Sequence, residues 1–232
     1  ITIICLDKFT ENDIVGNAFG LFIAAYETVS TAISFCLYEL SLNKSIQDRI
    51  RKEMELVKTR FVDNEEKYDM FNQLHYTDMV LAALKYFVET VRKYPPVAAL
   101  FREATQDYNM TEGLLLEKGI KIIIPIYSIH YNKMYYPNPY KFDPDRFLPE
   151  EKIKIRNGTY LPFGDGPRIC IGKRFAELEM KIALLEFLTN FEVAPCEKTD
   201  IPIKFSKNSF VVVPKNGIWL HIKKLNKTSK FS

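Results

Sequence analysis

The spacing of apolar residues predicts a long first helix. It begins at Thr10, where a hydroxyl is followed three residues later by the carboxylate of Asp13, as at a capped helix start. It runs to about Leu42 with apolar residues on all its faces, so we expect it to be buried on most sides. Because Glu27 and Glu39 interrupt the apolar run, the pattern indicates a buried helix rather than a membrane span.

Two further helices are predicted in the first half of the chain. A charged amphipathic helix is expected over 46–60, after a break at 43–45. A third helix is expected from a cap at Thr77-Asp78 to about Tyr94, where Pro95-Pro96 ends it. The apolar stripe of the amphipathic helix consists of Ile46, Ile50, Met54 and Val57.

The second half of the chain changes in character. Strands are predicted over 99–108 and 118–126, the second built around consecutive isoleucines. The stretch 132–167 is rich in Pro, Gly, Asn and aromatic residues, and most of it should be irregular. A last helix is expected over 173–190. In the tail, we expect 210–213 and 218–222 to form a hairpin across a Pro-Lys-Asn-Gly turn.

These elements predict an α+β fold, mainly α with small β-sheets, and 232 residues are enough for one large domain or two small ones. The composition, 47% hydrophobic and 26% charged, is that of a folded globular protein. A net charge of +3 is too small to make nucleic acid an expected partner. The four cysteines are not spaced as CxxC, which argues against a zinc site and favours a reducing compartment.

The strongest chemical signal is the string from Phe163 to Gly172, in which Cys170 stands among three glycines and a proline just before the last helix. Glycines let the backbone turn tightly and approach a flat ligand closely. A cysteine near a helix N-terminus, with Arg168 beside it, is favoured as a thiolate and hence as a metal ligand. The alternative is a glycine-rich turn around an ordinary buried cysteine.

Two charged or polar pairs also stand out, each with a plain alternative. Glu89 and Arg92 are three residues apart and share one helix face, which alone indicates a solvated ion pair. Glu27 and Thr28 lie in the middle of the apolar helix, where burying an acid and a hydroxyl is costly. The alternative for this second pair is a Thr hydroxyl bonded one turn back and a Glu that reaches solvent.

The motifs together resemble those of the cytochrome P450 family, especially microsomal insect detoxification and vertebrate drug-oxidising enzymes. The string at 163–172 matches the family's FxxGxRxCxG, and 89–92 matches its ExxR. The segment 142–147 matches the family segment in which Arg-Phe follows a Pro, and 24–28 matches the family's AGx(D/E)T. The resemblance covers essentially the whole chain and implies that 1–232 is the C-terminal part of a single domain with the P450 fold.

The resemblance implies haem b as the cofactor and Cys170 as the axial ligand to its iron. It implies that Arg168 and Arg102 reach the haem propionates, as bidentate pairing of guanidinium with carboxylate would allow. It also implies a buried network of Glu89, Arg92 and Arg146 that holds the irregular segment behind the haem. Further residues implied to lie against the haem are Phe163, Gly164, Ala24 and Ala25.

By the same resemblance, Glu27 and Thr28 are the catalytic pair that helps deliver protons to dioxygen. The sequence departs from the family here, because Ala25 replaces a Gly and Val29 replaces a Ser or Thr. The methyl group of Ala25 could narrow the oxygen groove, and Val29 removes one hydroxyl from the proton relay. These departures bear on coupling, not on haem binding.

The implied function is insertion of one oxygen atom of O2 into a lipophilic small molecule. The implied electron donor is an NADPH-cytochrome reductase, with a cytochrome b-type protein as a further candidate, and Lys173 and Arg174 fit a basic docking face. The implied location is the cytoplasmic face of the endoplasmic reticulum membrane, reached through an N-terminal anchor outside this chain. Substrate contacts are expected from residues 19–23, 97–100 and 209–210.

Two alternatives to this function remain open. One is a haem-binding protein without turnover, acting as a decoy. The other is a structural domain without haem, in which Cys170 belongs to the core.

Overall fold

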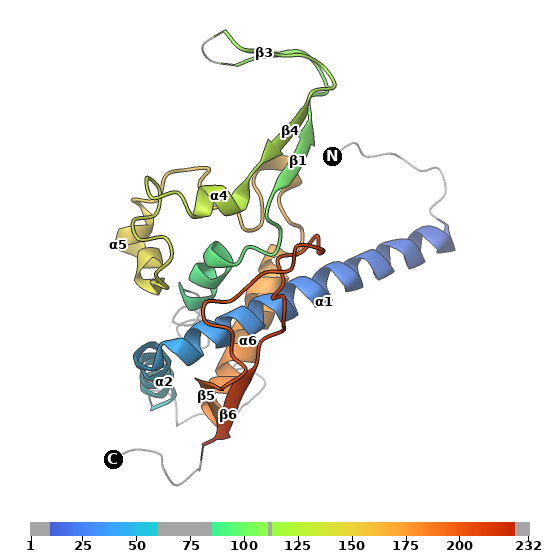
Figure 1. Ribbon diagram of the computed structural model, residues 1–232. Coiled ribbons are helices and arrows are strands. Elements are labelled where there is room, and N and C mark those ends of the chain that lie inside the picture. The colour runs from blue at the N-terminus through green and yellow to red at the C-terminus, as the bar shows by residue number, and fades with distance from the viewer. Residues whose placement is uncertain (1–9, 60–84, 111–112, 226–232) are drawn as a thin grey trace.

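The computed structural model describes residues 10–59, 85–110 and 113–225. Within these ranges the chain forms a helical body with three small two-stranded antiparallel sheets (Figure 1). The helices are α1 (Glu11–Leu42), α2 (Lys44–Thr59), a helical segment at 85–93, α4 (Ile126–His130), α5 (Pro149–Lys152) and α6 (Lys173–Asn190), with 3-10 turns η2 (Pro144–Phe147) and η3 (Gly166–Arg168). The strands are β1 (Leu100–Glu103), β2 (Tyr108–Asn109), β3 (Leu115–Leu116), β4 (Lys121–Ile124), β5 (Phe191–Pro195) and β6 (Leu220–Lys224). The predicted mainly helical α+β class is confirmed.

The helix predicted from Thr10 to Leu42 is present as α1. The Thr10 hydroxyl accepts from the N–H of Asp13 at 3.3 Å, and the Asp13 carboxylate accepts from the N–H of Thr10 at 2.9 Å. This reciprocal capping box satisfies two donors at the helix start. The last helix, α6, also has the bounds that the sequence predicts.

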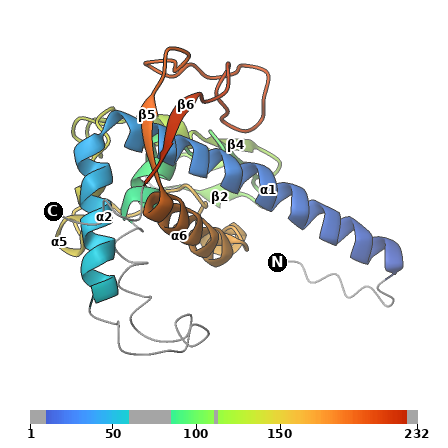
Figure 2. The ribbon, with the colours of Figure 1, turned by 90° about the horizontal axis from the view of Figure 1, so that it is seen from below.

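The expected burial of α1 is correct for only one half of the helix. From Val29 onward it packs against α6 and β5, and most of its side chains there are buried or half-buried. From Glu11 to Glu27 nearly every residue is exposed, because that half projects past the other described elements (Figures 1 and 2). By length and composition alone α1 could cross a membrane. In its packed half Glu39 is buried against Lys93, and this degree of burial is typical of a core helix.

The core lies where α1, the segment at 85–93 and α6 meet. On α6, Met180, Leu184 and Leu188 recur every four residues and so form one buried face. Two groups of buried side chains meet this face. The first contains Cys36, Leu40, Ile50 and Tyr86, and the second contains Val29, Ala32, Phe87 and Val91.

The predicted strands are shorter in the structure than in the pattern. The stretch 99–108 divides into β1 and the start of β2, and 118–126 contains only β4. The ladder pairs β1 with β4, with Arg102 opposite Ile122. Pro125 follows β4 and has no N–H to continue the ladder, so the chain turns there into α4, a helix that the sequence did not predict.

The predicted C-terminal hairpin is wrong in its pairing. The strand at 220–224 is β6, and it pairs with β5, with Ile222 opposite Val193. Val211 instead forms an isolated bridge with Val97. Strand β5 follows α6 directly and has a free edge with which β6 pairs. The alternation of side chains along β6 does not reveal this partner.

Two further predictions concern the stretch 132–167 and the helix that ends before Pro95. The stretch 132–167 is largely irregular, apart from the short helical turns η2, α5 and part of η3. The helix at 85–93 ends just before Pro95, as predicted, whereas its expected cap at Thr77-Asp78 lies outside the described residues.

Candidate functional site

Cys170 lies in the turn that leads from the irregular stretch into α6. Gly164 and Gly166 adopt φ angles of 73° and 72°, a region that favours glycine, so the shape of the turn depends on both. The main-chain N–H of Cys170 donates to the carbonyl of Phe163 at 2.9 Å. Helix α6 then begins at Lys173. The loop-then-helix arrangement predicted around the cysteine is therefore present.

The side chain of Cys170 is exposed beside the start of α6. A Cβ added to Gly172, which caps α6, would stand 3.9 Å from the sulfur, so the sulfur lies close to this backbone. The neighbouring side chain of Ile171 is 91% exposed, and that of Phe175 on α6 is 63% exposed. The alternative of a buried core cysteine does not match this geometry. An accessible sulfur with accessible apolar neighbours suits a large apolar ligand.

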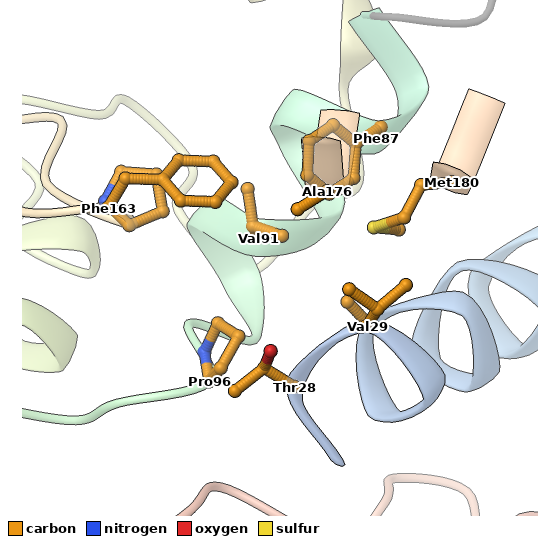
Figure 3. Close-up of a pocket in the computed structure, with 10 residues that line it drawn as sticks. Thr28, Val29, Phe87, Val91, Pro96, Phe163, Ala176 and Met180 are labelled. Atoms are coloured by element: carbon orange, nitrogen blue, oxygen red, sulfur yellow. The ribbon is translucent and has the colours of Figure 1, made fainter. Parts of the chain in front are cut away.

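A small hollow of about 30 Å³ lies between α1, the segment at 85–93 and α6 (Figure 3). Phe163, from the Cys170 turn, reaches the same hollow as Thr28 of α1. Among the described residues that line it, Thr28 carries the one polar side-chain group. The other lining residues are Val29, Ala32, Phe87, Val91, Pro96, Pro162, Ala176 and Met180. The structure thus brings two predicted site residues, from distant parts of the sequence, to one apolar hollow.

The predicted proton-delivery pair lies where the packed half of α1 begins. The Thr28 hydroxyl donates to the carbonyl of Ala24 at 2.6 Å, which is the back-bonded alternative for a helical Thr. Its oxygen keeps lone pairs with which it can accept a further hydrogen bond. Glu27 and Ala24 are exposed and Ala25 is half-buried. The catalytic role of this pair, and the haem contacts of the two alanines, stay predictions.

The two predicted propionate ligands come from β1 and from the Cys170 turn itself. A Cβ on Gly164 would meet Leu100 of β1 at 3.6 Å, so this face of β1 lies against the Cys170 turn. Arg102 follows two residues later and shares that face. Arg168 ends the η3 turn and is exposed. Within the described ranges, neither guanidinium has a carboxylate partner, so both are open to an anionic ligand.

The segments expected to contact substrate are only partly brought together. Val97 bridges Val211, and the N–H of Val212 donates to the carbonyl of Pro96 at 2.9 Å. This pairing places the turn at 97–100 beside the tail at 209–210. The third segment, at 19–23, lies on the projecting half of α1 and is exposed.

Glu89 and Arg92 form a fully buried ion pair, as the resemblance implies and the solvated alternative does not. Arg92 Nε lies 2.6 Å from Glu89 Oε2, and Arg92 Nη2 lies 2.9 Å from Glu89 Oε1. The same guanidinium donates to the carbonyls of His130 at 2.8 Å and Pro139 at 2.7 Å. The planar fork of Arg thus binds a carboxylate and two loop carbonyls at once, which Lys could not do.

The carboxylate of Glu89 holds the irregular stretch from the other side. Its Oε1 accepts from the main-chain N–H of Asp143 at 3.0 Å and lies 3.7 Å from Arg146 Nε. Arg146 also donates to the carbonyl of Asn138 at 3.1 Å. Burial raises the pKa of Glu89, and the contacts with Arg92 and Asp143 oppose that rise. The predicted network with Arg146 is confirmed.

His130 is a buried residue that sequence reasoning did not single out. Its Nδ1 lies 3.0 Å from the carbonyl oxygen of Arg92, and its Nε2 accepts from the main-chain N–H of Leu161 at 2.9 Å. The side chain therefore connects the ion-pair helix with the approach to the Cys170 turn. Nothing in its local sequence signals this, because both partners are distant in the chain.

Acid should destabilise the fold through His130. Burial lowers the pKa of His130 to about 4, from an ordinary value of 6.5. The unfolded chain therefore takes up the proton at higher pH than the folded chain, so the contribution is intact above about pH 6.5 and is lost as the pH falls towards 4. The loss is about 3 kcal/mol of unfolding free energy, measurable by urea unfolding across this range. In His130→Gln this part of the pH dependence should vanish; an unaltered dependence would contradict the assignment.

The residues around Cys170 fit a haem. An accessible sulfur, a turn with two left-handed glycines, an apolar hollow with one hydroxyl and two guanidinium groups without carboxylate partners in the described ranges match a flat apolar group with anionic side chains. Phe87, Val91 and Met180 also line the hollow. Apolar residues at helical spacing indicate a core position but not a hollow, so no local pattern signals that these three line it.

The chain is similar to known proteins over most of its length. The family model described as Cytochrome P450 matches residues 4–221. The chain is 44% identical to a probable cytochrome P450 6a13 of Drosophila melanogaster, over 95% of the chain and 44% of that protein. It is 39% identical to cytochrome P450 6j1 of Blattella germanica, over 94% of the chain and 42% of that protein. It is 37% identical to cytochrome P450 6A1 of Musca domestica, over 97% and 44%. The chain spans less than half the length of these relatives.

Proposed function

Because the chain belongs to the cytochrome P450 family, we propose that it carries the haem-binding part of a monooxygenase acting on lipophilic small molecules. One observation carries this proposal. The sulfur of Cys170 is accessible in a glycine turn, and Phe163 of that turn lines the same apolar hollow as Thr28. A family match alone supports membership, whereas this arrangement supports ligand binding.

The cofactor in this proposal is haem b, and the sulfur of Cys170 would hold its iron. When bound through a thiolate, the haem supplies activation of O2 for transfer of one oxygen atom to substrate. Arg168 and Arg102 would pair with its carboxylates and so orient it. The residues that would contact it are Phe163, Gly164, Ala24 and Ala25.

The chain's own part in proton delivery is assigned to Glu27 and Thr28. The hydroxyl of Thr28 is the polar group of an apolar hollow and donates its proton to the Ala24 carbonyl, so it can hold a water there by accepting a hydrogen bond. Glu27 is exposed and can exchange protons with solvent. Val29 is buried beside them and carries no hydroxyl, so Thr28 supplies the hydroxyl of the relay among the described residues that line the hollow.

Replacing Thr28 with Val should uncouple the reaction. The substitution keeps the shape of the side chain but removes its hydroxyl, so NADPH is still consumed while less of it yields oxygenated product. We expect product formed per NADPH to fall by about tenfold or more, with hydrogen peroxide rising in its place. Assays of NADPH, product and peroxide on the full-length protein with its reductase measure this. Thr28→Ser is the matched control, and a Val variant that stays as well coupled as Ser would refute the role.

Partners and location are also proposed. Electrons come from an NADPH-cytochrome reductase, with a cytochrome b-type protein as a second candidate donor, and Arg174 presents an exposed charge at the start of α6. Lys173 beside it is half-buried. The expected location is the cytoplasmic face of the endoplasmic reticulum membrane. The lipophilic nature of the substrate is supported by the apolar lining of the hollow.

The proposal is tested on the full-length protein by three measurements. These are the absorption spectrum of the reduced, CO-bound protein, consumption of NADPH with the reductase, and formation of oxygenated product from a panel of lipophilic compounds. All three should be positive. A thiolate-type Soret band without NADPH consumption would favour a haem-binding protein without turnover. Purification without stoichiometric haem would favour a structural domain.

A further inference from the structure

His130 ends α4 with its side chain fully buried. Because the carbonyl oxygen of Arg92 can only accept, the contact with Nδ1 requires a proton on that nitrogen. Because the main-chain nitrogen of Leu161 donates, the contact with Nε2 requires a lone pair there. The two contacts together define a neutral imidazole in a single tautomer.

Arg92 and His130 are joined in both directions. The guanidinium of Arg92 donates to the carbonyl of His130, while the imidazole of His130 donates to the carbonyl of Arg92. The same guanidinium is held by Glu89. The orientation of the imidazole is therefore set by the buried ion pair, not by α4 alone.

The other side of the imidazole holds the chain that leads to the ligand. Leu161, whose N–H donates to His130, accepts at its carbonyl from the N–H of Gly164 at 3.0 Å. Phe163 in turn accepts from the N–H of Cys170 at 2.9 Å. A short series of main-chain hydrogen bonds thus runs from the His130 ring to the backbone of Cys170.

We propose that His130 is a positioning residue for the thiolate site, which transmits the hold of the Glu89–Arg92 pair to the Cys170 turn through its bond to Leu161. This proposal rests on the proposed role of Cys170. The contacts of His130 are seen in the structure and do not depend on that role. No single bond in the series fixes the sulfur. Together these bonds hold the turn in one conformation, so the sulfur of Cys170 keeps the position from which it can bind the iron.

The surroundings of the ring keep it in the form that this role requires. The rings of Tyr160 and Tyr136 pack against it, with centroids 5.8 Å and 6.1 Å away, and the Arg92 guanidinium is the charged group that faces it. Glu89 stands behind Arg92. A second proton, on Nε2, would point a donor at the N–H of Leu161, so the connection holds only while the ring is neutral.

Two amide substitutions separate the two bonds of His130. In His130→Asn, the amide atoms stand at the distance along the side chain of Nδ1, so the bond to Arg92 can remain and that to Leu161 is lost. In His130→Gln, they stand one bond farther out, like Nε2, so an acceptor for Leu161 can remain. We expect exchange of the Leu161 amide hydrogen to be about tenfold faster in the Asn variant than in the Gln variant. This readout does not depend on haem.

The positioning role predicts a matching difference in ligation. The fraction of reduced, CO-bound full-length protein with the thiolate-type band should be clearly lower for His130→Asn than for His130→Gln. Leu188→Ala is the control, because it opens a cavity in the other part of the core and lowers stability without touching this series. It should keep the band fraction of the wild type.

The outcomes separate this proposal from the one on which it rests. A wild-type protein without the thiolate-type band would overturn the proposed function and this proposal with it. A wild-type band with equal fractions in the Asn, Gln and Leu188→Ala proteins would overturn the positioning role alone. Equal exchange of the Leu161 amide in the Asn and Gln variants would show that the bond to Leu161 does not restrain the turn, which also overturns it.

Discussion

Replacing Cys170 with Ser should abolish the thiolate-type band of the reduced, CO-bound protein and should remove monooxygenase turnover. A Ser hydroxyl has the size of the thiol but stays protonated near neutral pH, so it cannot supply the charged sulfur that a haem-thiolate iron requires. We expect turnover to fall below detection, and any haem that remains should absorb as a complex without thiolate. The absorption spectrum and the product assay, made on the same preparation of full-length protein, measure both effects.

The substitution should leave the fold nearly unchanged. The side chain of Cys170 is exposed, and the bond that closes its turn comes from its main-chain N–H, which Ser retains. We expect the unfolding free energy to change by less than about 0.5 kcal/mol in the haem-free state, as is usual for exposed positions. Loss of the band therefore reports loss of the ligand rather than loss of structure.

Cys196→Ser is the matched control for this experiment. Cys196 is a free, half-buried cysteine near the start of the tail, where its main-chain N–H donates to Thr199. It shares no contact with the Cys170 turn among the described residues, so its variant should keep both band and turnover. An unchanged spectrum and activity in Cys170→Ser would overturn the assignment of the ligand.

Features with a local sequence signal could be predicted from the sequence. The start of α1 depends on a hydroxyl and a carboxylate three residues apart, and α6 follows a glycine. Pro95 ends the segment at 85–93 because proline cannot continue a helix. The turn around Cys170 needs glycine at positive φ, and Gly164 and Gly166 supply it. In each case the decisive residues are within one turn of one another.

Features that depend on distant partners could not be predicted in this way. The apolar pattern at 218–222 indicated a strand, but its partner β5 was decided by where α6 ends. The pattern of α1 gave no sign that its first half projects past the other described elements, because a pattern does not tell which neighbours are present. His130 shows the same limit at the site. Its two partners are 38 and 31 residues away in the chain, so no local spacing marks it.

Replacing Arg92 with Ala should have the largest effect on stability. The change leaves the buried Glu89 carboxylate without its main counter-charge, and it leaves the carbonyls of His130 and Pro139 without their donor. Breaking a buried pair by removing one partner costs about 3 to 5 kcal/mol. Urea unfolding of the full-length protein should show a loss of this size, accompanied by weaker haem retention because the loops behind the site are released.

Arg49→Ala provides the matched control, since Arg49 also holds an Asp of the irregular stretch by two hydrogen bonds. It binds Asp145 with both distances at 3.0 Å, but its side chain is 39% exposed, whereas that of Arg92 is fully buried. A pair open to water is worth about 1 kcal/mol or less. The two variants therefore remove the same type of side chain from a two-bond pair with a carboxylate. They differ in burial and in the other partners, which are two loop carbonyls for Arg92 and the Tyr86 hydroxyl for Arg49. Equal losses in the two proteins would contradict the view that burial makes the Glu89–Arg92 pair critical.

Removing both partners tests what the pair does for the backbone. In a double variant with Glu89→Leu and Arg92→Met, no buried charge remains, so the loss should be smaller than the sum of the two single losses. It should not vanish, because the carbonyls of His130 and Pro139 and the N–H of Asp143 still lack the partners that the pair supplied. A double variant as stable as the wild type would mean that these loops hold themselves. In that case the pair would contribute only its mutual attraction, and the route from Glu89 through His130 to Cys170 would lose its first step.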